Sequence, residues 1–286
     1  MSKLAKGIMA NVNKLAAGQV PVADAYLKRF LFVTLVDISG STAEAFNGNP
    51  PDIQAINDAI PKICKALREP RAGTPLAKVH KQIDLAIVAY SHHTIEVLPW
   101  TLATQLNMSF TPLKPEGGTA TGAALEHVLR MIHARQTELR ASKTPIGLPH
   151  IIHVTDGGPT DMQPGDAKWT SVQARLAKVG GMQGLESIKT AAIMHFVTPN
   201  GCDPDFIGNK IFAASAGQTG MERLGQLSGA ASVHPLPEGL KMTETLVETV
   251  TATIINISTL NMSADEAAKA ATKKAKDSAH DGTIID

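Results

Sequence analysis

The sequence predicts an α/β protein with a doubly wound, mostly parallel sheet, one antiparallel edge strand and helices on both faces. Two observations lead to this fold class. Apolar runs without alternation, typical of strands buried on both faces, are separated by stretches whose apolar residues recur at helical spacing. The strand-like runs at 83–90 and 94–100 are joined only by Ser-His-His, which indicates a hairpin and therefore an antiparallel edge.

The expected elements alternate along the chain. The first strand covers residues 31–36, and the helix after it has Asp52 as a cap. A proline- and glycine-rich loop, "TPLKPEGGTATG", follows the hairpin and leads into the next helix. The remaining elements are a strand at 150–156, a helix around 167–179, strands at 190–197 and 231–236, and a closing helix with Leu246, Val250, Ile254 and Ile257 on one side.

These elements are expected to form one domain from residue 28 to residue 260, a length that α/β folds manage as a single unit. Residues 1–27 are expected to form an N-terminal helical arm. Residues 261–286 are rich in alanine and lysine, and we expect a flexible tail whose lysines are solvated.

Composition narrows the functional classes. A formal net charge of +1 argues against a dedicated nucleic-acid binder, and 4% aromatic residues leave few platforms for stacking bases. No apolar run is long enough to cross a membrane, and the N-terminus lacks the pattern of a signal peptide. We therefore expect a cytoplasmic protein. Its two cysteines suit a reduced compartment, with Cys64 in a core helix and Cys202 in a polar loop.

Three polar loops lie where the predicted strands end or a helix starts. Asp37, Ser39 and Ser41 follow the first strand, Thr119 precedes a helix, and Asp156 ends the strand at 150–156. Because the carboxyl ends of parallel strands share one edge, we expect these side chains to meet there. All of them offer hard oxygen donors, which suit Mg²⁺ or Mn²⁺.

The motifs "DISGS", "GGT" and "VTDG", in this order, resemble the metal-ion-dependent adhesion site (MIDAS) of von Willebrand factor A (VWA) domains. The resemblance covers roughly residues 28–260. It implies that Ser39, Ser41 and Thr119 are hydroxyl ligands, and that Asp37 and Asp156 bind the metal directly or through water. Within the family, "VTDGGPTD" and "GGTATGAAL" look closer to bacterial tellurite-resistance TerY-like proteins, which implies a stress-response system in a bacterium or phage.

If the ligands that contact the metal are mainly hydroxyls and water, which are neutral, the divalent ion keeps most of its positive charge. One open position then suits an Asp or Glu of a protein partner, so the leading hypothesis is a metal-dependent protein–protein interaction module and not an enzyme. Two alternatives stay open. In the first, the protein is a Mg²⁺-dependent phosphotransfer enzyme with Asp37 as its nucleophile. In the second, the chain is a structural scaffold subunit.

Simpler roles exist for the same residues. Taken alone, the first loop is more simply a turn whose hydroxyls cap backbone amides. Thr119 has an alternative role as the cap of the following helix, and Thr121 competes for that role. Asp161 is expected in solvent or as the cap of the helix near 167, with a peripheral role at the rim as the minor alternative, and Glu116 is expected in solvent. Two histidines, His92 and His93, are expected to be exposed in the hairpin turn. Three others are expected in or beside strands as core or edge residues: His150, His153 and His195.

Overall fold

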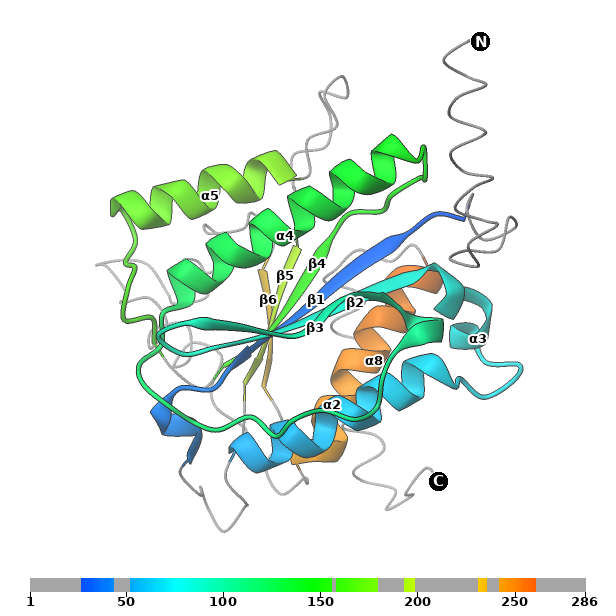
Figure 1. Ribbon diagram of the computed structural model, residues 1–286, viewed down its shortest axis with the longest axis horizontal. Helices are drawn as coiled ribbons and strands as arrows, with labels where there is room; N and C mark the ends of the chain where they lie inside the picture. Colours follow the sequence, from blue (N-terminus) through cyan, green and yellow to red (C-terminus); the bar gives the residue numbers. More distant parts are fainter. Residues whose placement is uncertain are drawn as a thin grey trace.

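The computed structural model describes residues 27–43, 52–155, 158–179, 193–198, 231–235 and 242–260. Their strands form one sheet in the order β3-β2-β1-β4-β5-β6 (Figure 1). All neighbouring strands pair in parallel except β2 and β3, which are antiparallel. The predicted fold class is therefore confirmed. The strands are β1 (Phe30–Asp37), β2 (Ile83–Tyr90), β3 (Thr94–Leu102), β4 (His150–Val154), β5 (Ile193–Thr198) and β6 (Ala231–Pro235).

Helices cover both faces of the sheet, as Figure 1 shows. On one face lie α4 and α5, and on the other lie α2, α3 and α8. The bounds of these helices are α2 (Asp52–Arg68), α3 (Pro75–Val79), α4 (Thr121–Ala141), α5 (Ala167–Val179) and α8 (Met242–Leu260). Short 3-10 helices are η2 (Gly40–Ala43), η3 (His80–Gln82) and η4 (Ala103–Gln105).

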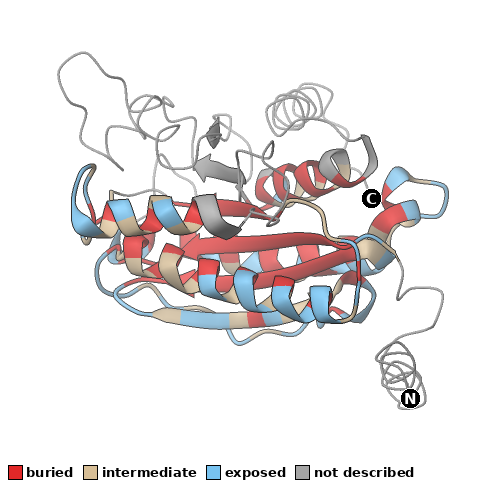
Figure 2. Cartoon of the chain, turned by 90° about the horizontal axis from the view of Figure 1, so that it is seen from above, coloured by how far each residue is buried: buried red, intermediate tan, exposed pale blue. Residues whose placement is uncertain are grey.

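The central strands are buried on both sides, so each of them supplies two hydrophobic cores. In β1, Phe32 faces α2 and α8 whereas Val33 faces α4 and α5, because successive side chains of a strand point to opposite faces. Figure 2 shows buried residues along the strands and on the sides of the helices that face them. Burial on both faces explains why the strands read as continuous apolar runs and not as alternating ones.

The predicted elements lie where the sequence placed them, with small differences at their ends. The strand predicted at 150–156 ends at Val154, and β3 continues to Leu102. The five-residue helix α3 was not predicted. Asp52, expected as a cap, is the first residue of α2 and is buried.

Core assignments within the helices can be compared as well. Leu246, Val250 and Ile254 of the closing helix are buried as expected. Cys64 is a core residue, and burial raises the pKa of its thiol to about 12. Four predictions cannot be compared, because they lie outside the described residues: the side chain of Ile257, Cys202, residues 1–26 of the predicted arm, and the tail at 261–286. Across the described ranges, none of the helices combines the length and hydrophobicity needed to cross a membrane.

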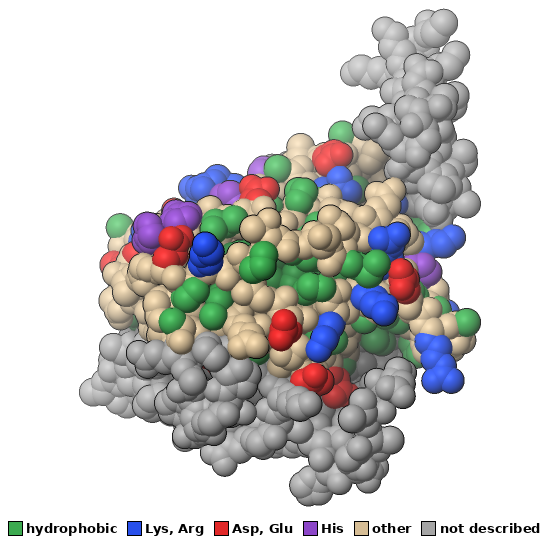
Figure 3. Space-filling view, turned by 60° about the horizontal axis from the view of Figure 1, so that its bottom comes forward, with side chains coloured by type: hydrophobic (Ala, Val, Ile, Leu, Met, Phe, Trp, Pro, Cys, Tyr) green, Lys and Arg blue, Asp and Glu red, His purple; other side chains and the backbone are tan. Residues whose placement is uncertain are grey.

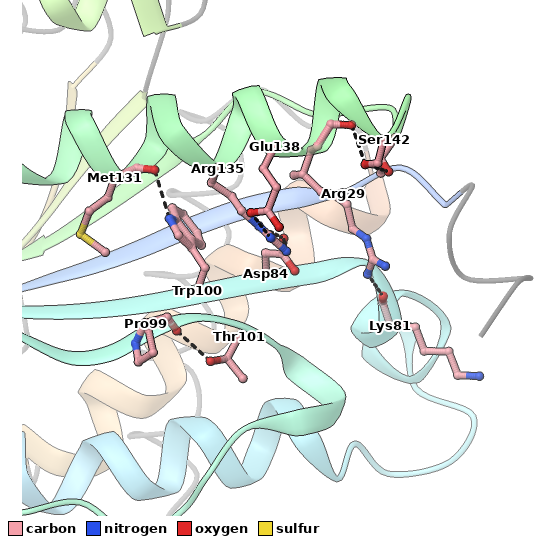
Figure 4. A network of polar contacts seen from close by, with 12 residues as sticks. Arg29, Lys81, Asp84, Pro99, Trp100, Thr101, Met131, Arg135, Glu138 and Ser142 are labelled. Carbon is pink, nitrogen blue, oxygen red and sulfur yellow. Dashed lines mark hydrogen bonds and ion pairs between the residues drawn. The ribbon is translucent and has the colours of Figure 1, made fainter. Parts of the chain in front are cut away.

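The amino edge of the sheet, where β1 and β2 start, is held by charged side chains (Figure 4). Asp84 on β2 is fully buried, and its Oδ2 accepts hydrogen bonds from Nε and Nη2 of Arg135 on α4, at 3.0 and 2.8 Å. Arg135 also reaches the carboxylate of Glu138 with Nη1 at 2.7 Å. Arg29, also buried, donates from Nη1 to the carbonyl oxygen of Lys81 at 2.6 Å. These contacts fasten α4 and the start of β1 to the sheet.

Candidate metal site at the carboxyl edge of the sheet

Asp37 is the last residue of β1 and has no solvent-exposed surface. Its Oδ1 accepts a hydrogen bond from the backbone N–H of Ser39 at 2.8 Å. Its Oδ2 accepts one from the hydroxyl of Thr155 at 2.7 Å, which links the end of β1 to the residue that follows β4. The carboxylate is therefore held in one orientation by groups from two separate loops.

Ser39 and Ser41 project from the turn after β1. Their Oγ atoms are 3.1 Å apart, although Ser39 is buried and Ser41 is exposed. The turn is stabilised from within, because the Thr42 hydroxyl donates to the carbonyl oxygen of Ser39 at 2.7 Å and η2 starts at Gly40. Two hydroxyls of the first predicted loop are thus side by side at the sheet edge.

The second loop is joined to the first by backbone hydrogen bonds. The N–H of Gly40 donates to the carbonyl oxygen of Gly117 at 3.0 Å, and the N–H of Glu116 donates to that of Ile38 at 2.9 Å. Gly117 has φ +61°, and a Cβ there would collide with the imidazole of His92. Only glycine fits this position, so Gly117 is needed where the two loops meet.

Thr119 lies in this second loop immediately before α4. It is 6% exposed, and its carbonyl oxygen accepts from the N–H of Thr160 at 2.8 Å, which adds the third loop to the cluster. Within the part of the chain that the structure describes, its hydroxyl has no hydrogen-bond partner, whereas that of Thr121 lies 3.3 Å from the Tyr90 hydroxyl. Asp156 lies outside the described residues, but Thr155 beside it contacts Asp37.

Neither Thr119 nor Thr121 caps α4 with its side chain; Asp161 does. Its two carboxylate oxygens accept from the N–H groups of Gly122 and Ala123 at 2.8 and 2.9 Å, and Lys168 lies 2.8 Å from Oδ2. The main expectation, that Asp161 lies in solvent or caps the helix near 167, was wrong, whereas the minor alternative of a peripheral role at the rim agrees with its contacts to Gly122 and Ala123. The sequence carried no signal for this contact, because the cap comes from 39 residues further along the chain.

A buried polar cluster lies beneath the loops. The hydroxyl of Tyr90, at the end of β2, is 2.7 Å from Nε2 of His153 on β4 and also contacts Thr121. Burial lowers the pKa of His153 to about 3, so the imidazole is neutral and can share a hydrogen bond with the tyrosine. His150, stacked on Phe32, is likewise buried, and both are core histidines as expected. The side chain of His195 lies outside the described residues.

His92 and His93 are exposed in the hairpin turn, as predicted. Nδ1 of His93 is 3.1 Å from Nε2 of His92. Nε2 of His93 is 3.1 Å from the Glu116 carboxylate. Glu116 is exposed as expected, but it faces a histidine and not only solvent. These three side chains line the rim beside Gly117.

The donors fit a hard divalent cation better than a soft one. Two oxygens that bind one octahedral ion at about 2.1 Å are about 3.0 Å apart, close to the 3.1 Å between the Oγ atoms of Ser39 and Ser41. In the described ranges, no group of three or more His, Cys, Asp or Glu side chains is arranged to hold a metal. A metal centre at this edge therefore depends on hydroxyl oxygens together with carboxylates.

Residues 32–158 match the family model described as von Willebrand factor type A domain. This part of the chain is similar to a VWA domain. The matched residues include most of β1, all of β2, β3 and β4, the first two loops described above, and Thr155 of the third. A search of curated protein sequences found no match.

Several solved structures are similar to this chain at low sequence identity. The pilus adhesin SpaC from Lactobacillus rhamnosus GG is 13% identical, with a TM-score of 0.49 over 81% of this chain and 31% of SpaC. The PilB minor pilin from Streptococcus sanguinis is 13% identical, with a TM-score of 0.47 over 86% of this chain and 65% of PilB. The ArnB paralog VWA2 from Sulfolobus acidocaldarius is 15% identical, with a TM-score of 0.43 over 78% of this chain and 46% of VWA2. The chain thus spans less than two thirds of each of these proteins.

Proposed function

We propose that the protein is a divalent-metal-dependent interaction module that binds an Asp or Glu side chain of a protein partner. Asp37, Ser39, Ser41, Thr119 and Asp156 would hold Mg²⁺ or Mn²⁺. The bound metal would supply a positive charge with a coordination position open to the partner's carboxylate. The fold and the VWA match make binding the expected role, and the metal dependence is the proposal.

One observation carries the proposal: three loops from distant parts of the sequence are bonded to each other at one edge. Gly40 bonds to Gly117, Thr160 bonds to Thr119, and Thr155 bonds to Asp37. Backbone atoms make most of these bonds, so the hydroxyl of Thr119 is left available to a ligand. A turn or a helix cap alone does not need a third loop.

Because Asp37 is buried, its replacement by alanine is not a suitable test of metal binding. Its replacement by alanine would leave the N–H of Ser39 and the hydroxyl of Thr155 without their acceptor, so a loss of metal binding would be confused with a loss of structure. Thr119→Val is cleaner, because valine has the same shape and lacks only the hydroxyl. Ser41→Ala is also suitable, because Ser41 is exposed.

We expect the protein to bind one Mn²⁺ ion, and Thr119→Val and Ser41→Ala to weaken this binding at least tenfold, as measured by the electron paramagnetic resonance signal of free Mn²⁺. Thr121→Val is the matched control, because Thr121 is two residues further on and its hydroxyl already faces Tyr90. It should bind Mn²⁺ like the unchanged protein. Equal Mn²⁺ affinity in all four proteins would disprove the site.

The geometry gives less support to the phosphotransfer alternative. A nucleophilic carboxylate must approach its substrate, but Asp37 has no exposed surface and both of its oxygens accept hydrogen bonds. Hydrolysis of a general phosphatase substrate with Mg²⁺, lost in Asp37→Asn, would reverse this order of preference. The scaffold alternative predicts identical assembly with and without Mg²⁺ in scattering experiments.

The setting of the function remains part of the proposal. The motifs "VTDGGPTD" and "GGTATGAAL" favour a TerY-like role in a bacterial or phage stress response. A cytoplasmic location, which is part of the proposal, agrees with a sequence that has only two cysteines.

A further inference from the structure

A groove of about 580 Å³ runs between β3 and the segment at 106–116 that connects η4 to the second loop of the site. We call it the β3 groove. Its volume is within the range of about 300–1,000 Å³ that ligand clefts occupy. Figure 3 shows the face of the molecule along which this segment runs, with hydrophobic side chains gathered between charged ones. The lining includes Ile95, Val97 and Pro99 from β3, and Phe110, Leu113 and Lys114 from the opposite wall.

One wall of the β3 groove is an edge strand. β3 pairs with β2 on one side and is the last strand of the sheet on the other. Within the described residues, the backbone groups of β3 that point away from β2 have no backbone partner. Ile95 is also a large hydrophobic side chain with 37% of its surface exposed. An extended polypeptide satisfies both features, because it pairs with the backbone and covers alternate side chains.

Lys114 gives the β3 groove a contact for one acidic group of an occupant. The charged residues of the lining are Glu96, Glu116 and Lys114. Each glutamate faces a histidine, because Glu96 lies 3.2 Å from Nε2 of His127 and Glu116 lies 3.1 Å from Nε2 of His93. Lys114 is exposed and has no ion-pair partner among the residues that the structure describes, so its ammonium group can pair with a carboxylate of the occupant.

The β3 groove is continuous with the candidate metal site. Glu116 belongs to the lining, and its N–H donates to the carbonyl oxygen of Ile38 between Asp37 and Ser39. Thr119 is three residues beyond Glu116, at most about 10 Å along an extended chain. About three or four extended residues would therefore lead from the end of the groove to the metal.

We propose that the β3 groove binds an extended segment of the partner protein, which pairs with β3 as an added strand and presents its Asp or Glu to the metal. This inference rests on the proposed function and deepens it, because it states the conformation of the partner. The ends of this chain and a second copy of β3 are competing occupants. Lys114, which has no ion-pair partner among the described residues, and the short distance along the chain from Glu116 to Thr119 favour a partner segment with an Asp or Glu over both.

The test begins with a displayed library of random peptides, selected for binding to the full chain in Mg²⁺. We expect the selected peptides to share an Asp or Glu at a fixed distance from a run of alternating β-branched or aromatic residues. Methylation of single backbone nitrogens should lower affinity at least tenfold at alternate positions and by less than about threefold at the positions between, because only every second N–H of a strand faces β3.

Variants then locate the peptide. Lys114→Glu and Ile95→Lys should each weaken binding of the selected peptide at least tenfold, without changing the affinity of the protein for Mn²⁺. Lys78→Glu is the matched control, because Lys78 is exposed on α3 and is not part of the lining. It should bind the peptide normally.

The possible failures can be told apart. If no selected peptide depends on Lys114 or Ile95, or if backbone methylation has no alternating effect, the inference is overturned. The same holds if sedimentation shows a dimer that Ile95→Lys dissolves, since a second copy then occupies the edge. If methylation acts as expected but EDTA leaves peptide binding unchanged, strand docking stands and the proposed metal-dependent function is rejected.

Discussion

The two edges of the sheet use polar residues in opposite ways. At the amino edge, charges satisfy each other: buried Asp84 binds Arg135, which also binds Glu138 (Figure 4). At the carboxyl edge, backbone groups join the loops, and the Thr119 hydroxyl is left without a partner among the described residues. The first arrangement stabilises the domain. The second keeps oxygen atoms available for a ligand.

The comparison suggests that stability and binding can be separated experimentally. α4 extends from one edge to the other, with Asp161 at its start and Arg135 near its end. Changes near Arg135 should destabilise the domain without altering the metal site in the molecules that remain folded. Changes near Asp161 should affect both properties.

The largest expected effect comes from Arg135→Leu at the amino edge. The substitution leaves the Asp84 carboxylate buried without a cation, and removal of one partner from a buried pair costs about 3–5 kcal/mol. Urea denaturation should show this loss, while Mn²⁺ affinity of the folded protein stays unchanged. Glu138→Gln is the matched control, because its side chain is 61% exposed and should change stability by no more than about 0.5 kcal/mol.

An intermediate effect concerns pH and the two buried histidines. Burial lowers the pKa of His150 and His153 to about 3, whereas the usual value is 6.5. Below pH 6.5 the unfolded chain takes up protons that the folded protein does not bind until about pH 3. The stabilising contribution is therefore complete above pH 6.5 and is lost as pH falls towards 3, by about 1.4 kcal/mol per pH unit for each histidine.

His150→Phe tests this prediction, because it keeps an aromatic ring against Phe32 and removes one titrating group. The slope of unfolding free energy between about pH 5 and 6 should fall to roughly half. A second variant, His153→Phe, should reduce the slope equally but also lower stability at pH 8, because the Tyr90 hydroxyl loses its hydrogen bond to His153. An unchanged slope in His150→Phe would show that this histidine is protonated in the folded protein.

The smallest expected effect sharpens the role of the carboxyl edge. Asp161→Ala removes the cap of α4 and should cost about 1 kcal/mol, and it should also weaken Mn²⁺ binding, because α4 begins two residues after Thr119. Asp166→Ala removes the cap of α5, where Oδ1 accepts from the N–H of Trp169 at 2.6 Å. It should lower stability and leave Mn²⁺ affinity unchanged. Equal Mn²⁺ affinities in the two variants would show that the α4 cap does not position Thr119.

Most of the fold could be predicted from periodicity, since strands buried on both faces and helices with one apolar side leave a local record. β2 was predicted residue for residue, and the antiparallel hairpin followed from a three-residue turn. The boundaries of β4 and the short α3 were missed. A five-residue helix has too few turns to show a period.

Within the site, the sequence identified which side chains carry oxygen donors and in which loops they lie. It did not show that Asp37 is buried, nor that Thr155 fixes it, although Thr155 directly precedes Asp156 in the motif that was recognised. The role of Asp161 was assigned to the wrong helix, because a cap adjacent in sequence was assumed. Asp156 itself remains a prediction.

By itself, the sequence determined the order of strands and helices and the types of polar residue at each strand end, because both depend on neighbours along the chain. The tertiary structure was needed to show which atoms join the loops and which carboxylate orients the helix after Thr119. Those contacts join residues that are tens of positions apart. They depend on how closely the loops approach each other at the sheet edge, and no local pattern encodes that approach.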